Sequence, residues 1–142
     1  MDDLEARQRV ADARVARLGT LTRAGQVHLV PICFVLDGDR LYTAVDGKPK
    51  RSRALRRLEN VRAHPEACVL IDGWDEDWSK LWWVRLRGRA VVLEGGPEHE
   101  RALQLLRAKY GQYAEDPLGP VIAVVLGEWR SWSAGTAGEQ GS

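Results

Sequence analysis

The chain has 142 residues, of which 44% are hydrophobic and 29% are charged, and its formal net charge is +1. This length suits one domain with a substantial core, and the composition favours a folded protein over a disordered one. No run of about 18 uncharged apolar residues is present, and the first 17 residues are too charged for a signal peptide. Near-neutral charge argues against a nucleic-acid partner. We therefore expect a cytoplasmic protein without a membrane or nucleic-acid partner.

The N-terminal part predicts a helix followed by three strands. Residues 2–18 are expected to form a helix with one apolar stripe, made by Leu4, Ala11, Val15 and Leu18. Strands are expected at 18–22, 27–36 and 40–45, because turn residues separate these apolar runs and the Asp37-Gly38 pair signals a hairpin. Both alternating sets of side chains in 27–36 are largely apolar, which predicts cover on both faces, as in a barrel strand that also packs on a helix or a second subunit.

The remaining elements complete a mainly β pattern. We expect a helix over 48–64, a buried strand at 67–71, a long strand over 81–94 with a bulge at Gly88, a helix over 97–110 and a last strand at 121–126. Strands and helices do not alternate as doubly wound folds require. The sequence predicts an α+β fold, a six-stranded antiparallel split β-barrel with flanking helices. It occupies 1–132 as a single domain, followed by a disordered tail at 133–142.

Familiar catalytic machinery is missing from the sequence. It has no Gly-x-Ser-x-Gly elbow, phosphate loop or His-Glu-x-x-His motif. The three histidines are scattered and expected to be structural or exposed, and the acidic run 75–77 is typical of a solvated loop rather than a metal site. Cys33 and Cys68 lie in apolar strands, where a reduced thiol behaves as a small hydrophobe. We predict neither a nucleophile nor a metal.

A basic segment and a group of tryptophans are the candidate binding features. Lysines and arginines crowd positions 48–62 beside a single acid, Glu59, where a helix starts just after a strand. Arginine forks and helix-start amides at such a place can hold a phosphorylated ligand, although a solvated helix face explains the run equally well. Four tryptophans could stack on a planar ring, but a place in the core or in a dimer interface explains them better: Trp74, Trp78, Trp82 and Trp83.

Several segments together resemble a known family. They are residues 18–22, the Val30-Pro31-Ile32-Cys33-Phe34 strand, Tyr42–Val45 followed by a basic helix ending in Leu58–Pro65, and the Asp75–Ala90 segment. In order and spacing this pattern is similar to the pyridoxamine-phosphate-oxidase-like split barrels. Within that superfamily it resembles the oxidoreductases that use the deazaflavin coenzyme F420. The similarity extends from about residue 11 to residue 132.

The resemblance implies a homodimer with two equivalent cofactor sites between subunits. It places phosphate contacts on Arg57 and Asn60, with Lys48, Lys50 and Arg51 as further candidates for the phosphate or the acidic tail. It places ring contacts on Val30, Pro31 and Ile32 and on Thr43, Ala44 and Val45. It also implies that Trp132 approaches the cofactor from the other subunit. The substrate signature of true pyridoxamine-phosphate oxidases is not evident, so vitamin B6 oxidation is not expected.

Three functional hypotheses follow. The first is an oxidoreductase that binds F420 and transfers hydride to a small unsaturated substrate. Such chemistry needs positioning more than a protein nucleophile, with solvent, Tyr42 or Tyr113 as the acid. The second keeps the fold but uses FMN. The surplus of positive charge at 48–57 suits the additional anionic tail of the deazaflavin and so favours F420. The third is a non-catalytic flavin or haem carrier, whose haem ligand would come from His28, His64, His99 or the two cysteines.

Overall fold

The computed structural model describes residues 1–46, 52–115 and 118–135. Its helices are α1 (Asp3–Asp12), α2 (Ser52–Ala63) and α3 (Pro97–Lys109). Its strands are β1 (Ala16–Leu21), β2 (Val27–Ile32), β3 (Val35–Asp37), β4 (Arg40–Asp46), β5 (Glu66–Gly73), β6 (Trp82–Leu93) and β7 (Leu118–Ser133). Short 3₁₀ helices lie at Trp78–Lys80 and Gly111–Ala114. No helix of the described residues is long and apolar enough to cross a membrane.

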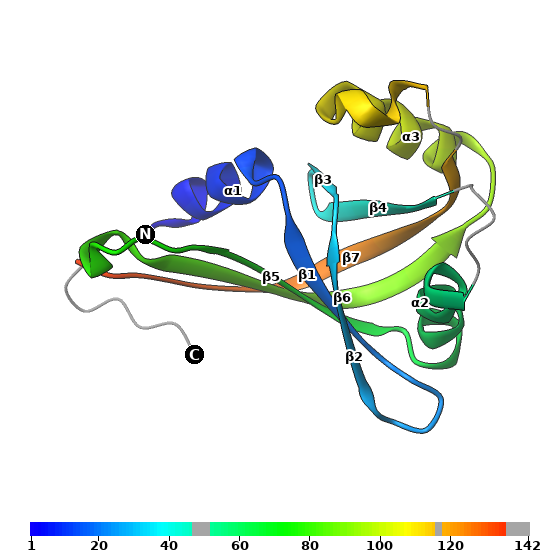
Figure 1. Cartoon of the computed structure of the whole chain (residues 1–142), viewed down its shortest axis with the longest axis horizontal. Helices are drawn as coiled ribbons and strands as arrows, with labels where there is room; N and C mark the ends of the chain where they lie inside the picture. Colours follow the sequence, from blue (N-terminus) through cyan, green and yellow to red (C-terminus); the bar gives the residue numbers. More distant parts are fainter. Residues whose placement is uncertain (47–51, 116–117, 136–142) are drawn as a thin grey trace.

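The strands form one antiparallel sheet in the order β2-β1-β5-β6-β7-β4-β3. Within the described residues the sheet has seven strands rather than the expected six, and hydrogen bonding does not close it into a barrel. The expected strand at 27–36 is broken at Cys33 and Phe34. Its first part pairs with β1 and its second part pairs with β4. We call the gap spanned by these two residues the split. Only two residues join the edge strands β2 and β3, so the sheet curls until its edges meet (Figure 1).

The N-terminal helix is shorter than expected. It ends at Asp12, and the expected stripe is wrong, because Ala6 and Val10 are buried while Leu4 is exposed. Ala16 and Leu18 instead belong to β1, which pairs with β2 on one side and β5 on the other. The hydrogen bonds of β1 to β2 and β5, together with the burial of Ala16 and Leu18, favour a strand here over a further helical turn. This preference comes from tertiary contacts, which the helical spacing of apolar residues does not reveal.

Several local predictions are confirmed. The β3–β4 hairpin turns at Gly38, whose φ of 62° is the left-handed conformation that glycine adopts without a Cβ clash. The β6–β7 register shifts between Arg87 and Gly88, the predicted bulge. Helix α3 begins with Pro97 and turns Leu106 toward the core. The expected tail lies outside the described residues from position 136 onward, while Ser133 still belongs to β7.

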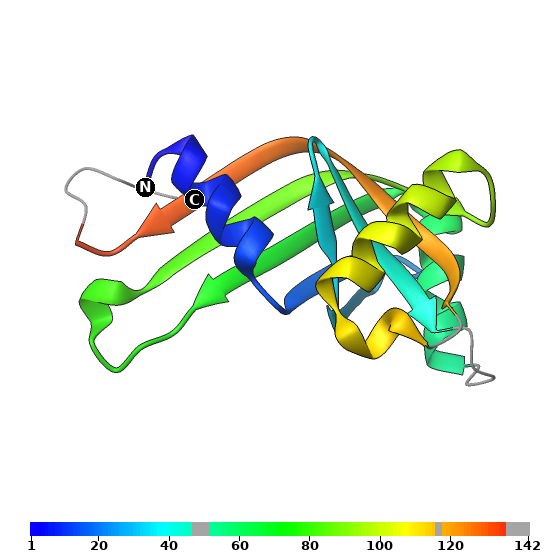
Figure 2. The ribbon, with the colours of Figure 1, turned by 90° about the horizontal axis from the view of Figure 1, so that it is seen from above.

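Two hydrophobic clusters position the helices. The larger fills the concave side of the curled sheet, where Phe34, Leu86 and Ile122 are fully buried and α1 and α2 add cover. The smaller lies between α3 and strands β4 and β7, around Leu106 and Val121. Seen from above, α3 runs across the β3–β4 hairpin and α1 lies along the other half of the sheet (Figure 2). Among the helices that the structure describes, none covers the opposite face of β2, β1 and β5.

The Tyr110 side chain provides hydrogen bonds for the backbone groups at the split. The hydroxyl of Tyr110 accepts a hydrogen bond from Phe34 N at 3.0 Å and lies 3.0 Å from the carbonyl oxygens of Phe34 and Arg14, to either of which it can donate. Phe34 is fully buried, so water cannot replace these contacts. Tyr110 therefore joins α3 to the point where the two sheet edges diverge.

Replacing Tyr110 with phenylalanine is expected to lower the free energy of unfolding by about 2 kcal/mol, because a buried backbone N–H loses its partner. Urea unfolding at pH 7 measures the change. Leu4→Ala is the control, since Leu4 is 78% exposed and its truncation leaves the core untouched. A loss no larger than that of the control would show that the hydroxyl does not hold the split together.

Candidate functional site

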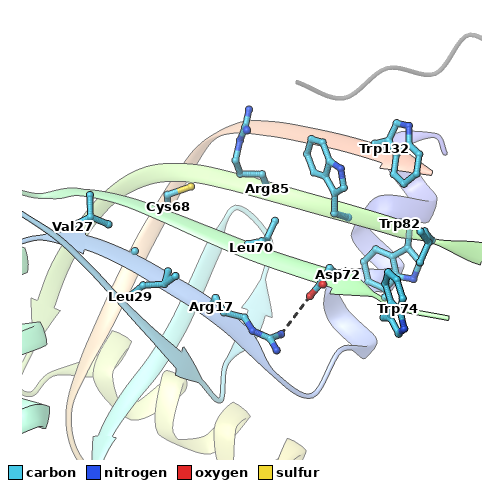
Figure 3. Close-up of a pocket in the computed structure, with 14 residues that line it drawn as sticks. Arg17, Val27, Leu29, Cys68, Leu70, Asp72, Trp74, Trp82, Arg85 and Trp132 are labelled. Atoms are coloured by element: carbon cyan, nitrogen blue, oxygen red, sulfur yellow. Dashed lines mark hydrogen bonds and ion pairs between the residues drawn. The ribbon is translucent and has the colours of Figure 1, made fainter. Parts of the chain in front are cut away.

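A groove of about 630 Å³ crosses the uncovered face of the sheet, and we call it the outer groove. Its floor is apolar: Val27 is 79% exposed, Leu29 is 65% exposed and Leu70 lies beside them on β5. Cys68, a free thiol, is part of the same lining. Figure 3 shows these side chains standing on β2 and β5. A contiguous exposed apolar surface of this kind marks an interaction or ligand-binding site.

Tryptophans form one end of the outer groove. Trp132 on β7 lies opposite Trp83 on β6 in the strand register, and both line the groove with Trp82 and Trp74 (Figure 3). The indole of Trp82 lies directly over Gly73, where a Cβ would collide with the ring nitrogen. Glycine at this position thus lets an aromatic ring lie flat against the strand. The indole surfaces provide an aromatic wall on which a planar ring can stack.

Guanidinium groups flank the apolar floor. Arg17 Nη1 lies 3.4 Å from Asp72 Oδ1, and both side chains are about half exposed. Such a pair is weakly held in water, so Arg17 can turn to an anionic ligand at low cost. Arg85 also lines the groove, with its guanidinium 5.6 Å from the ring of Trp83. The outer groove therefore combines apolar walls with positive charge at its edge.

A second group of side chains lies at the split. Thr43 Oγ1 donates to Cys33 O at 2.8 Å, and the phenol of Tyr113 faces the Cys33 side chain. Burial, followed by the neighbouring Cys33, raises the pKa of Tyr113 to about 12. Burial lowers the pKa of the Arg57 guanidinium, which faces Tyr113 from α2. Arg57 remains cationic, and a partly desolvated guanidinium binds an anion more strongly than one in bulk water.

The residues expected to contact a cofactor fall into three groups. Pro31 is exposed on the face that carries Val27 and Leu29, Val30 is half-buried, and Ile32 is buried. The side chains of Thr43, Ala44 and Val45 are buried, so a ligand can reach this part of β4 only through its backbone. Trp132 lies in the outer groove, on a different part of the chain from Arg57.

The remaining expected contacts lie elsewhere. Asn60 is buried and its amide donates to Thr20 Oγ1 at 3.2 Å, which ties α2 to β1. Asn60 also borders a polar pocket at the β1–β2 turn. The other expected phosphate contacts lie outside the described residues: Lys48, Lys50 and Arg51. Of the two tyrosines considered as acids, Tyr42 donates to Glu98 Oε2 at 2.8 Å beneath α3, and burial followed by Glu98 raises its pKa to about 12.

Sequence reasoning missed much of the outer groove. It did not select Arg17, Leu29, Leu70 or Arg85 as binding residues. One signal was available, because apolar side chains on both faces of 27–36 predicted a partner for each face. In the described part of a single chain, Val27 and Leu29 remain exposed to solvent.

An amine beside the split has an unusual environment. Lys109 Nζ lies 4.0 Å from the ring centre of Phe34, and no hydrogen-bond partner faces it among the described residues. Burial, followed by the charge of Arg14, lowers the pKa of Lys109 to about 8. Between pH 8 and the unfolded-state value of 10.5, the unfolded chain holds a proton that the folded chain has released. The free energy of unfolding therefore rises with pH in this window.

Comparison with Lys109→Met isolates this effect. From pH 7.5 to 9.5, the free energy of unfolding of the wild type is expected to rise by about 1 kcal/mol relative to the variant, a value reduced for solvent screening because the Lys109 side chain as a whole is only half-buried. Chemical denaturation at intervals of half a pH unit measures it. Parallel curves for the two proteins would place the Lys109 titration outside this window.

The curled, split antiparallel sheet with three flanking helices defines the split-barrel class. The chain belongs to the pyridoxamine 5'-phosphate oxidase family, whose profile matches residues 3–133. This agrees with the broader resemblance seen in the sequence. No protein in the curated set matches the sequence.

Solved structures share the fold at low sequence identity. A conserved hypothetical protein of Mycobacterium tuberculosis aligns with a TM-score of 0.75 and 18% identity, over 94% of this chain and 85% of that one. A haem-binding protein of Mycobacterium smegmatis gives 0.75 and 20%, over 97% and 56%. HutZ, the haem storage protein of Vibrio cholerae, gives 0.71 and 11%, over 97% and 98%. These likenesses establish the fold.

Proposed function

We propose that this chain is a homodimeric oxidoreductase that binds coenzyme F420 between two copies and transfers hydride to a small unsaturated substrate. The observation that carries the proposal is the outer groove, a cavity of about 630 Å³ with an apolar floor that ends in tryptophans and is flanked by arginines. This volume lies within the range of small-molecule and cofactor sites, roughly 300–1,000 Å³.

The residues fit the chemistry of the cofactor. A tricyclic ring needs flat apolar walls, which Leu29, Trp83 and Trp132 provide. A phosphate and an acidic tail need guanidinium groups, and Arg57 at the split is already partly desolvated. In one chain Arg57 and Trp132 belong to separate regions. A second copy laid on the exposed apolar face would bring the groove of one copy to the split of the other.

The described residues act by binding, orientation and exclusion of water. A bound reduced deazaflavin supplies the hydride. Leu29, Leu70 and the tryptophan wall keep water from the ring, and the guanidinium groups fix its orientation, which is the main protein contribution to cofactor chemistry of this type. The phenol of Tyr113 holds its proton at neutral pH, because its pKa is about 12. It can therefore act as a hydrogen-bond donor beside Arg57.

Titration of the purified protein with F420 and, separately, with FMN tests the proposal through quenching of tryptophan fluorescence. We expect saturable quenching by both and at least tenfold tighter binding of F420, because the additional anionic tail meets the basic residues at 48–57. Loss of the 420 nm absorbance of oxidised F420 on reduction then provides an assay for acceptor substrates. Absence of quenching by both cofactors would contradict the proposal.

One observation favours a second candidate, a haem carrier. Of the described histidine and cysteine side chains, only Cys68 lines the outer groove. A thiolate is a common axial ligand of haem iron, and arginines at the groove edge suit propionates. Two of the structures with this fold are named as haem-binding or haem storage proteins. A Soret band on addition of haemin that shifts in Cys68→Ala, without binding of F420, would replace the first proposal with this one.

A further inference from the structure

A projecting hairpin carries two exposed tryptophans beside a run of acids. We call residues 74–80, between β5 and β6, the tryptophan tip. Trp74 is 68% exposed and Trp78 is 67% exposed, with ring centres 6.4 Å apart in an edge-to-face arrangement. Asp75, Glu76 and Asp77 lie between them. Exposed aromatic pairs of this size are typical of interaction surfaces.

The tryptophan tip is held in one conformation by its own hydrogen bonds. Asp75 Oδ1 accepts from Asp77 N at 2.8 Å, and Asp77 Oδ1 accepts from the Ser79 backbone N at 3.1 Å and from Ser79 Oγ at 2.7 Å. A 3₁₀ turn at 78–80 follows. A surface ordered in this way loses little conformational entropy when it binds.

At the opposite end of the molecule lies a polar pocket of about 350 Å³ between the β1–β2 turn and α2. We call it the Arg23–Arg56 pocket. Two arginines and one acid, Glu59, line it with Thr22, Gln26 and Asn60. Figure 1 shows the β5–β6 connection at one end of the sheet and α2 at the other. The uncovered outer groove joins the two ends, because Trp74 and Val27 are both part of its lining.

We propose that the tryptophan tip of one copy docks into the Arg23–Arg56 pocket of a second copy, twice per dimer. A two-fold axis through the outer groove places the tip of each copy at the β1–β2 end of the other, where it reaches around the β1–β2 turn to the pocket on the α2 side. The acids of the tip then face guanidinium groups, and the indoles receive Arg23 and Arg56 over their rings. The tip therefore closes the end of the shared groove. This inference rests on the homodimer of the proposed function and identifies which surfaces complete it.

A charge exchange tests the contact by sedimentation velocity on the protein without cofactor. Glu76→Arg and Arg56→Glu are each expected to weaken dimerisation at least tenfold, and the double variant is expected to recover most of the loss. Trp78→Ser is expected to weaken it at least as much as either single change. Glu100→Arg on α3 is the control, since it makes the same charge change outside the proposed interface and should leave dimerisation unchanged.

The outcomes separate this inference from the proposed function. A wild-type dimer that binds F420, with single variants that dimerise like the control, would overturn the docking of the tip and leave the function standing. An Arg56→Glu protein that dimerises normally but loses F420 affinity would assign the pocket to the anionic tail of the cofactor, and it would also overturn the inference. Recovery in the double variant supports the contact whether or not F420 binds.

Discussion

Alanine in place of Arg57 is expected to weaken the binding of F420 by roughly 10- to 100-fold, the loss of one or two charge-assisted hydrogen bonds. The guanidinium is half-buried at the split beside Tyr113, so solvent competes less for it than for the exposed Arg56 and Arg62 of the same helix. Fluorescence titration at fixed ionic strength measures the affinity. Arg57→Lys is expected to recover part of the loss, because it keeps the charge but not the fork geometry.

Arg62→Ala is the matched control for this prediction. Arg62 lies on the same helix, is exposed, and forms an ion pair with Glu94 at 3.5 Å. Its removal is expected to change the F420 affinity less than threefold. The two variants should unfold at similar urea concentrations, which separates a binding defect from a folding defect. Equal affinities for the Arg57 and Arg62 variants would remove Arg57 from the cofactor site.

Aspartate in place of Leu29 is expected to weaken dimerisation by at least roughly 100-fold, since it places an unpaired charge at the centre of the proposed interface. Leu29 is 65% exposed in one chain, so the fold of the single chain does not depend on it. Sedimentation velocity over a range of protein concentrations measures the change. F420 affinity should fall with it, because Trp132 of the second copy would no longer cover the ring.

Leu4→Asp makes the same change at another exposed leucine. Leu4 is on α1, which lies against one side of the sheet (Figure 1), whereas the outer groove is on the other side. This variant is expected to remain dimeric at wild-type concentrations. If the Leu29 variant also remains dimeric, the outer face is not the interface, and the shared cofactor site built on it fails as well.

Local patterns in the sequence predicted most elements and a part of the site. The Asp37-Gly38 hairpin, the bulge at Gly88 and the start of α3 at Pro97 each depend on the chemistry of a few neighbouring residues, so they can be identified without tertiary information. The family resemblance selected Arg57 and Trp132, and the structure places them at the split and in the outer groove. The split-barrel family was also evident from segment order and spacing.

The tertiary structure decided where some elements begin and end and which side chains meet, which the spacing of apolar residues along the chain cannot reveal. Whether residues 16–18 continue a helix or begin β1 depends on ladders to β2 and β5, whose residues are distant in the chain. The break at Cys33 and Phe34, which made seven strands from an expected six, depends on the Tyr110 hydroxyl far along the chain. The outer groove exists because five strands place one face of their side chains together. The sequence by itself determined most of the elements, their turns and the family, since these follow from local chemistry. The curl of the sheet decided which side chains meet and which apolar face stays open.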